Sequence, residues 1–362
     1  MGEFEDKTRK QRMPSMHEGL PGQAKGIFST APAGKQLAGR YSLLEEIGAG
    51  GMGKVFRAHD QEADKVCAVK VMHNHLKADS TNTMRFEREA RLALALKHKN
   101  VVDVMDFGLT ETLEPFIVME YLVGESLGDI IQYKGRLELE RFAPIFAQIC
   151  NGLSYAHASN VVHRDMKPSN IMLLAVSEGS NDRDQIGNAA SRKTAGAQSG
   201  SEHVKIVDFG IAKACGTTGD ICPNSVAALR SLRDESTNLA PDMTDLLQSL
   251  TQPGEIFGSP LYMSPEQCYG EEADCRSEVY ALGCMMFETL TGRAPLKGRN
   301  AMETMLKRVN EKAPTMNEVL GHEEFDREIE QVIARCLERD PGKRYQTVAE
   351  LGDTLQQLAI NS

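Results

Sequence analysis

Short runs of β-branched and aromatic residues, separated by glycine and polar turn residues, fill the chain from about residue 41 to residue 120. Such runs are typical of strands, and their spacing predicts a small, mainly antiparallel sheet. The runs lie at residues 41–47, 54–58, 66–71, 101–107 and 116–120. Within residues 81–97, Phe86, Ala90 and Leu94 instead recur at helical spacing, so one helix is expected beside the sheet.

After about residue 125 the apolar residues recur every three or four positions, which is typical of helices with one buried face. The predicted fold class is therefore α+β, with a small sheet lobe over residues 40–122 and a larger helical lobe over residues 123–358. The clearest apolar stripes are Phe142, Ile145, Phe146, Ile149, Leu153 and Ala156; Val279, Leu282, Met286 and Leu290; Phe325, Ile329, Val332, Ile333 and Cys336; and Val348, Leu351, Leu355 and Leu358.

Three segments do not fit a compact core. Residues 1–39 combine proline, glycine and mixed charge without apolar periodicity, so we expect a disordered tail. Residues 175–203 are rich in Ser, Gly, Asn and Ala and separate two hairpin-like strands. Hairpin loops normally have about 2 to 5 residues, so this segment is expected to be a disordered insertion. The long stretch 208–266 includes helix-like spacing only at 224–232.

The overall charge and the cysteines limit the class of protein. A net charge of −10 argues against a nucleic-acid binder, because phosphate backbones are held by clustered Lys and Arg. The eight cysteines form no C-x-x-C pair and no zinc-ligand spacing, which favours reduced thiols in the cytoplasm. No apolar run reaches the length needed to span a membrane, and the N-terminus lacks the regions of a signal peptide.

A glycine-rich run follows the first predicted strand. Gly48, Ala49, Gly50, Gly51 and Gly53 lie in a G-x-G-x-x-G pattern, whose backbone can approach phosphate oxygens closely because glycine has no Cβ. The pattern alone is weak, since dinucleotide folds and plain turns share it. Here β-patterned residues lie on both sides, which favours a glycine-rich flap over ATP.

A lysine and a glutamate form the second candidate group. Lys70 ends an apolar strand, and Glu89 lies on the helix face that carries Phe86, Ala90 and Ala93. Taken separately, Lys70 could extend to water and Glu89 could be solvated. A carboxylate among apolar residues is costly to bury without a positive partner, so we predict a Lys70–Glu89 ion pair. Such a pair would hold the ammonium at the α- and β-phosphates of ATP.

Residues 163–170 read His-Arg-Asp-Met-Lys-Pro-Ser-Asn, and residues 208–210 read Asp-Phe-Gly. Asp165 is the candidate group that orients an attacking hydroxyl and accepts its proton. Lys167 would balance charge on the transferred γ-phosphoryl group. Asn170 and Asp208 offer hard oxygen ligands for Mg²⁺, with Mn²⁺ as an alternative ion. The two segments together predict phosphoryl transfer.

Residues from about 41 to 358 resemble the eukaryotic-type (Hanks-type) protein kinase family, and most of all its bacterial serine/threonine branch, where a Gly-Gly-Met-Gly flap is frequent. The resemblance implies a two-lobed fold that binds ATP in the cleft and phosphorylates proteins. Lys167, two places after Asp165, resembles serine/threonine rather than tyrosine kinases. On the same resemblance, the adenine side of the site is formed by Val55, Ala68, Met172, the gatekeeper Met119, and the backbone of Glu120 and Leu122.

The resemblance extends to the side that receives a protein substrate. Residues 258–260 (Gly-Ser-Pro) look like the substrate-side loop, and Glu266 looks like the end of the activation segment. The family pattern implies a buried Glu266–Arg344 pair, whereas the alternative is two surface charges. Glu278 stands where the family usually has Asp, and despite its extra methylene it is expected to cap the catalytic-loop backbone. This difference leaves the placement of Arg164 open.

Arg164, directly before Asp165, suggests control by phosphorylation of the activation segment. Autophosphorylation through a transient homodimer is a hypothesis that follows. The alternative function is a kinase-shaped nucleotide-binding scaffold with weak or no transfer, although such proteins usually lack Lys70, Asp165 or Asp208. The candidate acceptors are Thr217, Thr218, Ser225, Ser231, Ser236, Thr237 and Thr251, most of them expected to be plain loop hydroxyls.

Overall fold

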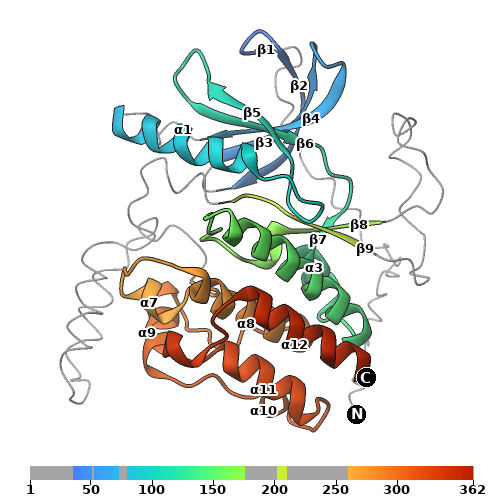
Figure 1. The fold of residues 1–362 in the computed structure, drawn as a ribbon, viewed down its shortest axis with the longest axis vertical. Coiled ribbons are helices and arrows are strands. Elements are labelled where there is room, and N and C mark those ends of the chain that lie inside the picture. The colour runs from blue at the N-terminus through green and yellow to red at the C-terminus, as the bar shows by residue number, and fades with distance from the viewer. Residues whose placement is uncertain (1–35, 51–52, 73–79, 176–201, 210–259, 362) are drawn as a thin grey trace, which may run out of the picture.

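The computed structural model describes residues 36–50, 53–72, 80–175, 202–209 and 260–361 (Figure 1). Most of the predicted tail, the predicted insertion and the predicted activation segment therefore lie outside the described residues. The same holds for the helix-like piece at 224–232 and for all the candidate phosphorylation sites.

A six-stranded antiparallel sheet forms the upper lobe in Figure 1, with strand order β1-β2-β3-β4-β6-β5. The single helix α1 (Ser80–Ala95) packs beside this sheet through the buried residues Phe86, Ala90 and Ala93. This confirms the predicted antiparallel sheet with one helix. The strands are β1 (Gln36–Leu37), β2 (Tyr41–Gly50), β3 (Gly53–Asp60), β4 (Lys65–Met72), β5 (Val104–Leu109) and β6 (Pro115–Glu120).

The sheet begins earlier than the sequence suggested. Leu37 pairs with Tyr41 in the β1–β2 ladder, and both side chains are buried. Ala38 and Gly39 make the tight turn between the strands with φ angles of 52° and 68°. The prediction that residues 36–39 belong to a disordered tail is therefore wrong, because one buried leucine beside a turn extends the sheet.

The lower lobe is helical, and α8 (Cys275–Thr291) runs through its core with nearly every residue buried (Figure 1). Helices α3 (Leu139–Ala158), α11 (Arg327–Cys336) and α12 (Val348–Asn361) pack around α8. All four predicted apolar stripes are therefore confirmed as helices, except that Phe325 precedes α11. The shorter helices are α2 (Leu127–Lys134), α7 (Pro265–Cys268), α9 (Ala301–Asn310) and α10 (Met316–Leu320).

A three-stranded sheet, β7 (Glu125–Ser126), β8 (Ile171–Ala175) and β9 (Glu202–Ile206), joins the two lobes. The β8–β9 ladder extends to the pair Ala175–Glu202, so the prediction that 175, 202 and 203 belong to a disordered insertion is wrong. Two hydrogen bonds of 2.7 Å from Arg141 to the Glu202 carboxylate hold this end of β9. Gln148 Nε2 also donates to the Glu202 carbonyl at 2.9 Å.

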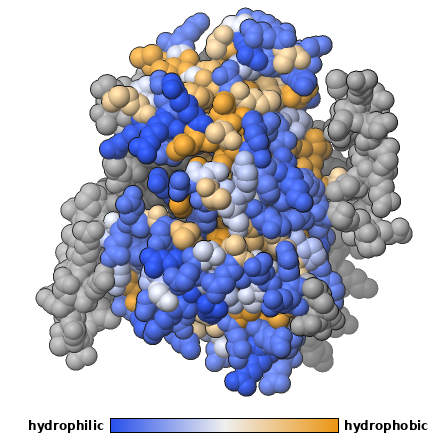
Figure 2. All heavy atoms as spheres, viewed as in Figure 1, coloured by the Kyte–Doolittle hydropathy of each residue, from blue (hydrophilic) through white to orange (hydrophobic). Residues whose placement is uncertain are grey.

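Figure 2 shows mostly hydrophilic side chains over the lower lobe, while hydrophobic ones gather higher up. Within the described ranges, no helix has the length and hydropathy of a membrane span. The exposed large hydrophobic residues are concentrated in and just after the sheet lobe, at Leu44, Ile47, Met84, Met105, Leu113, Val123 and Tyr133.

Candidate active site

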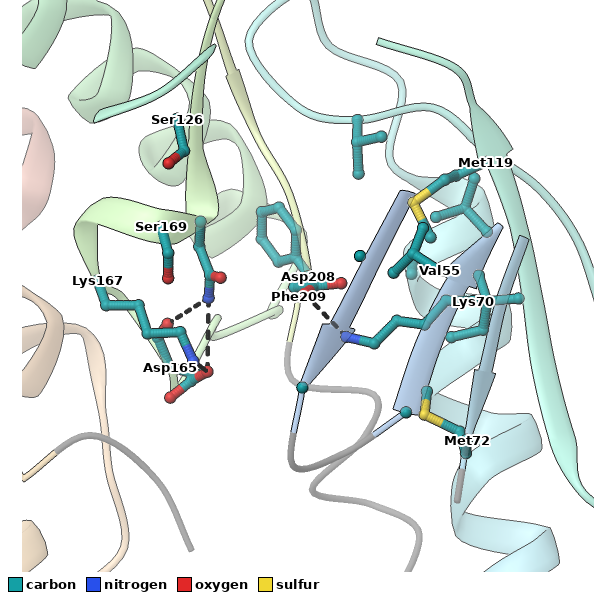
Figure 3. A pocket seen from close by; sticks show the side chains of 18 of the residues that line it. Val55, Lys70, Met72, Met119, Ser126, Asp165, Lys167, Ser169, Asp208 and Phe209 are labelled. Atoms are coloured by element: carbon teal, nitrogen blue, oxygen red, sulfur yellow. Dashed lines mark hydrogen bonds and ion pairs between the residues drawn. The ribbon is translucent and has the colours of Figure 1, made fainter. Parts of the chain in front are cut away.

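A cavity of about 490 Å³ lies between the lobes (Figure 3). The structure brings most of the predicted site residues to its wall. Those residues are Gly48, Ala49, Gly50, Gly53, Val55, Lys70, Met119, Asp165, Lys167, Asn170 and Asp208. The wall also includes residues to which the sequence assigned no role in the site: Met72, Ala93, Leu96, Val101, Val102, Val104, Ile117, Ser126, Asp129, Ser169 and Phe209.

The end of β2 and the start of β3 form the roof of the cavity. Gly48 pairs with Val55, and Gly53 pairs with Met72 of β4. A Cβ on Gly53 would lie 2.3 Å from the Val71 carbonyl oxygen, so only glycine fits at this point of the sheet. Gly51 lies outside the described residues. The flap is thus a pair of strands rather than a turn that opens a helix.

The predicted adenine-side residues fall into two groups. Ala68 and Met119 are buried in one hydrophobic cluster, against which Val55 and Leu122 pack. Only Val55 and Met119 of the set line the cavity itself. The contacts of Ala68, Glu120, Leu122 and Met172 with adenine therefore stay predictions.

The Glu120 side chain connects the end of β6 to β9. Its Oε1 accepts a hydrogen bond of 2.7 Å from the Asp103 backbone N–H. The same oxygen forms an ion pair with Lys205 Nζ at 2.6 Å. Lys205 also donates to the Val101 carbonyl at 3.1 Å. Because β9 leads directly to Asp208, this contact couples the segment between the lobes to the metal-ligand candidate.

Lys70 is buried and pairs with Asp208, at 2.8 Å from Nζ to Oδ2 (Figure 3). The predicted Lys70–Glu89 ion pair does not form in this structure, where Glu89 is half-buried. The physical reason is that Asp208 supplies the negative charge that the buried ammonium requires. Burial would raise the pKa of the Asp208 carboxyl, but the charge of Lys70 lowers it below its usual value.

The catalytic-loop candidates contact one another directly. Asp165 Oδ2 lies 2.7 Å from Lys167 Nζ, and both side chains face the cavity. Asn170 Nδ2 donates to the Asp165 carbonyl at 2.7 Å and approaches Oδ2 at 3.4 Å. A short 3-10 turn, Pro168–Asn170, places the asparagine one turn after Lys167. The amide oxygen of Asn170 is therefore the atom of this side chain that can bind a metal.

His163 is fully buried and holds the loop against the strand that precedes Phe209. Its Nδ1 accepts from the Asp165 backbone N–H at 3.3 Å, so Nε2 carries the proton and donates to the Val207 carbonyl at 2.9 Å. The ring also lies 4.6 Å from the Phe209 ring. Arg164 and Asp208, on either side of this contact, both have left-handed backbone angles, with φ of 64° and 61°. Such angles persist only where the surroundings fix them.

Glu278 provides a second support for the loop. Its Oε1 accepts a hydrogen bond of 2.8 Å from the Arg164 backbone N–H, and its Oε2 lies 2.6 Å from His157 Nε2. The side chain is only 2% exposed. A glutamate at this position thus caps the catalytic loop as an aspartate would, and the extra methylene allows it to reach His157 as well.

Asp208 and Asn170 fit a magnesium ion, because Mg²⁺ is usually bound by one or two protein oxygens together with substrate phosphates. Both residues line the same cavity as Lys70 and the glycine-rich strands. No group of three or more His, Cys, Asp or Glu side chains in the described part of the chain could hold a metal alone. The arrangement thus suits an ion that enters with a nucleotide.

The predicted Glu266–Arg344 pair is present and buried. Two hydrogen bonds of 2.8 Å join the guanidinium to the carboxylate, and Arg344 is 1% exposed. Burial would raise the pKa of Glu266, but the hydrogen bonds and charge of Arg344 lower it below 4.5. The alternative of two surface charges is excluded. Gly258 and Ser259, the first residues of the predicted substrate-side loop, lie outside the described residues.

Sequence reasoning missed His157, Lys205 and Arg308. Each contacts a segment of the site that is far away in the sequence. His157 ends a helix, and Lys205 lies on a strand, so neither spacing suggested a partner. Arg308 offered one clue, since it lies beside the helical stripe of Met302, Met305 and Val309. A charged residue next to an apolar stripe needs polar partners if it is buried.

The fold and the site together define a protein kinase, and the chain belongs to the Protein kinase domain family, which matches residues 41–354. It is 33% identical over 318 residues to the serine/threonine-protein kinase PknB of Mycobacterium tuberculosis, covering 87% of this chain and 42% of PknB. It is 34% identical over 311 residues to the serine/threonine-protein kinase pkn3 of Myxococcus xanthus, covering 86% and 48%. The chain thus spans less than half the length of these curated relatives.

The crystal structure of the Mycobacterium tuberculosis PknI kinase domain superposes with a TM-score of 0.61 and covers 91% of this chain and 99% of that one. At 21% identity this likeness shows the fold alone. The predicted two-lobed fold and the predicted kinase family, with its bacterial serine/threonine branch, are therefore confirmed.

Proposed function

We propose that this chain is an ATP-dependent serine/threonine protein kinase. The observation that carries the proposal is the Asp165–Lys167 pair, which faces the Lys70–Asp208 pair across one cavity roofed by glycine-rich strands. The Asp165–Lys167 pair suits an acceptor hydroxyl and the γ-phosphoryl group. The Lys70–Asp208 pair suits the remaining phosphates and a metal ion.

In this reaction Asp165 orients the acceptor hydroxyl and accepts its proton, while Lys167 stabilises charge on the transferred group. Lys70 binds the α- and β-phosphates. Asp208 and Asn170 would hold Mg²⁺, or Mn²⁺, whose positive charge would offset the negative charge of the phosphates. Substrate binding must then divide Lys70 between Asp208 and phosphate.

Several finer statements belong to the same proposal. The boundary between the lobes at residues 122 and 123 follows from the hydrophobic pattern, whereas autophosphorylation within the activation segment 208–266 and a transient homodimer follow from the family resemblance. A reducing, cytoplasmic setting is supported by the free thiols of all six cysteines within the described ranges. The protein substrates are expected to offer Ser or Thr hydroxyls.

The test is phosphate transfer from labelled ATP with Mg²⁺ to the protein itself and to histone, followed by mass spectrometry of the products. We expect Asp165→Asn to abolish labelling, because the amide cannot accept the hydroxyl proton. Asp353→Asn, on the exposed face of α12, is the matched control and should label normally. Unchanged labelling by Asp165→Asn would overturn the role of Asp165. Binding of ATP without any transfer by the wild type would favour the scaffold function instead.

A further inference from the structure

Arg308 of α9 is a fully buried cation, and no carboxylate among the described residues hydrogen-bonds it. Its side chain is 0% exposed, and it forms no ion pair with any carboxylate of the described residues. Arginine stays protonated in proteins, so its N–H groups must find acceptors inside the lobe. Burying a charge costs free energy, so the hydrogen bonds that compensate for this cost indicate which segments Arg308 holds in place.

Two of the four acceptors of Arg308 are backbone oxygens at the end of the predicted substrate-side loop and directly after it. Nε donates to the Pro260 carbonyl at 2.8 Å, and a second nitrogen donates to the Leu261 carbonyl. The remaining donor contacts Tyr280 Oη at 3.2 Å and Cys284 Sγ at 3.0 Å, both on α8. One side chain thus joins α9, α8 and the 260–261 backbone.

Residues 260–263 lie directly beside the catalytic loop. Tyr262 and Met263 line a small hollow together with Arg164, Asp165 and Met166. This segment therefore forms part of the surface next to Asp165. A displacement of about 1 Å of a group that positions a substrate can cost roughly 100-fold in rate.

A second buried arginine holds the other end of the same segment. Arg344 binds Glu266, six residues after Pro260. The guanidinium carbons of Arg308 and Arg344 lie over the ring of Tyr280, 5.5 Å and 4.9 Å from its centroid. The electron-rich ring face attracts both cations and so offsets their mutual repulsion. The segment between residues 260 and 266 is anchored at both ends.

From these contacts we infer that Arg308 is a positioning residue for the protein substrate: it fixes the 260–263 backbone beside Asp165 so that an acceptor Ser or Thr binds in the reactive geometry. This role rests on the proposed kinase function and deepens it. It predicts that loss of Arg308 impairs use of the acceptor and leaves use of ATP unchanged, because Arg308 contacts none of the residues that line the nucleotide cavity.

The test compares Arg308→Met, Arg308→Lys and Arg339→Met in full steady-state kinetics with ATP and histone. Arg308→Met keeps the apolar volume but leaves two carbonyls unpaired, so the KM for histone should rise about tenfold. The KM for ATP and the hydrolysis of ATP without histone should stay at wild-type values. Arg308→Lys should recover part of the loss, since it keeps a donor without the planar fork.

Arg339→Met is the matched control, because Arg339 also donates to carbonyls of α9, at Val309 and Asn310, but does not contact residues 260–263. It should leave the KM for histone unchanged. Equal effects of the two Met variants, or equal effects of Arg308→Met on both substrates, would show a merely structural role and overturn the inference.

Hydrogen exchange provides a readout that does not depend on activity. In Arg308→Met the amides of residues 261–263 should exchange faster, while those of α10 stay unchanged. Exchange at wild-type rates would overturn the inference. If the wild type transfers no phosphate, the proposed function fails, and the exchange experiment still decides whether Arg308 anchors the segment.

Discussion

At the scale of single residues, the loop that carries Asp165 is held by side chains that do not line the nucleotide cavity. Glu278 binds the Arg164 backbone and His157 with its two oxygens. His163 contacts the Asp165 N–H and the Val207 carbonyl through its two ring nitrogens. Because Arg164 has a left-handed φ of 64°, the energetic preference of its own backbone opposes the observed geometry. The neighbouring hydrogen bonds must therefore hold it.

Glu278→Ala tests this support. The variant removes the hydrogen bonds of the buried Glu278 carboxylate to the Arg164 N–H and to His157, so the free energy of unfolding should fall by about 1–3 kcal/mol. We expect kcat to fall about tenfold through misplacement of Asp165, with a smaller change in the KM for ATP. Urea unfolding measures the free energy of unfolding, and steady-state kinetics measures kcat and the KM for ATP.

Glu328→Ala is the matched control, since Glu328 lies in the first turn of α11 as Glu278 does in α8, but is exposed. Glu278→Gln should lie between the wild type and Glu278→Ala, because an amide oxygen can still accept from Arg164 but carries no charge for His157. A wild-type kcat in Glu278→Ala would contradict the supporting role.

At the scale of elements, α7 is held against the start of α8 and the chain before α12 by Glu266. This carboxylate accepts from Arg344 and, at 2.6 Å, from Ser277 Oγ. A helix of four residues has little stability of its own, so its position depends on these contacts and on the capping box of Ser264 and Gln267.

Glu266→Gln should therefore lower the free energy of unfolding by about 3 kcal/mol at neutral pH, because it leaves Arg344 buried without a negative partner. The difference should depend on pH. The folded pKa of Glu266 lies below its usual value of 4.5, so its contribution is fully present above pH 4.5 and is lost as pH falls below that value. Urea unfolding by circular dichroism at several pH values measures the difference.

Glu311→Gln, which removes an exposed carboxylate at the end of α9, is the control and should not change stability at any of these pH values. A difference between wild type and Glu266→Gln that stays constant down to pH 3 would show that the carboxylate charge does not contribute.

Sequence patterns predicted the elements with long apolar stripes and missed the short ones. Helices α3, α8, α11 and α12 each bury a stripe that recurs over several turns, and the sequence located all of them. Helix α9 was missed because its buried face includes Arg308 and Thr304 beside Met302 and Met305. The buried charge of Arg308 is satisfied by tertiary contacts, which apolar periodicity in the sequence does not reveal.

The same limit applies to the site. Motif spacing located half of the residues at the cavity wall, among them the glycines, Asp165 and Asn170. The partner of Lys70 could not be predicted in this way, because Asp208 and Glu89 both carry carboxylates and motif spacing does not show which of them contacts Lys70. Only the folded arrangement decides between them, and here it selects Asp208.

At the scale of the whole molecule, β9 and the residues that follow it connect the two lobes. Ile206 exchanges backbone hydrogen bonds with Asn100 and Val102, and Lys205 binds Glu120. Two residues beyond Ile206, Asp208 pairs with Lys70 of the sheet lobe. The position of β9 therefore determines how the lobes meet at the cavity, and its first residue, Glu202, directly follows the segment 176–201.

We predict that this segment can be replaced by a two-residue Asn-Gly turn without loss of function. Ala175 and Glu202 are paired directly, which is the geometry that a two-residue hairpin closes. The free energy of unfolding should change by less than about 1 kcal/mol, because no described core contact is removed. Transfer from ATP to histone should match the wild type.

A second variant separates the roles of the turn and of the ion pair. Arg141→Ala removes the two hydrogen bonds that hold Glu202, and it should lower the stability of the wild type by about 1 kcal/mol. In the shortened protein the same change should have a smaller effect, because the tight turn already holds Glu202 beside Ala175. Loss of transfer in the shortened protein at unchanged stability would instead show that residues 176–201 take part in the reaction.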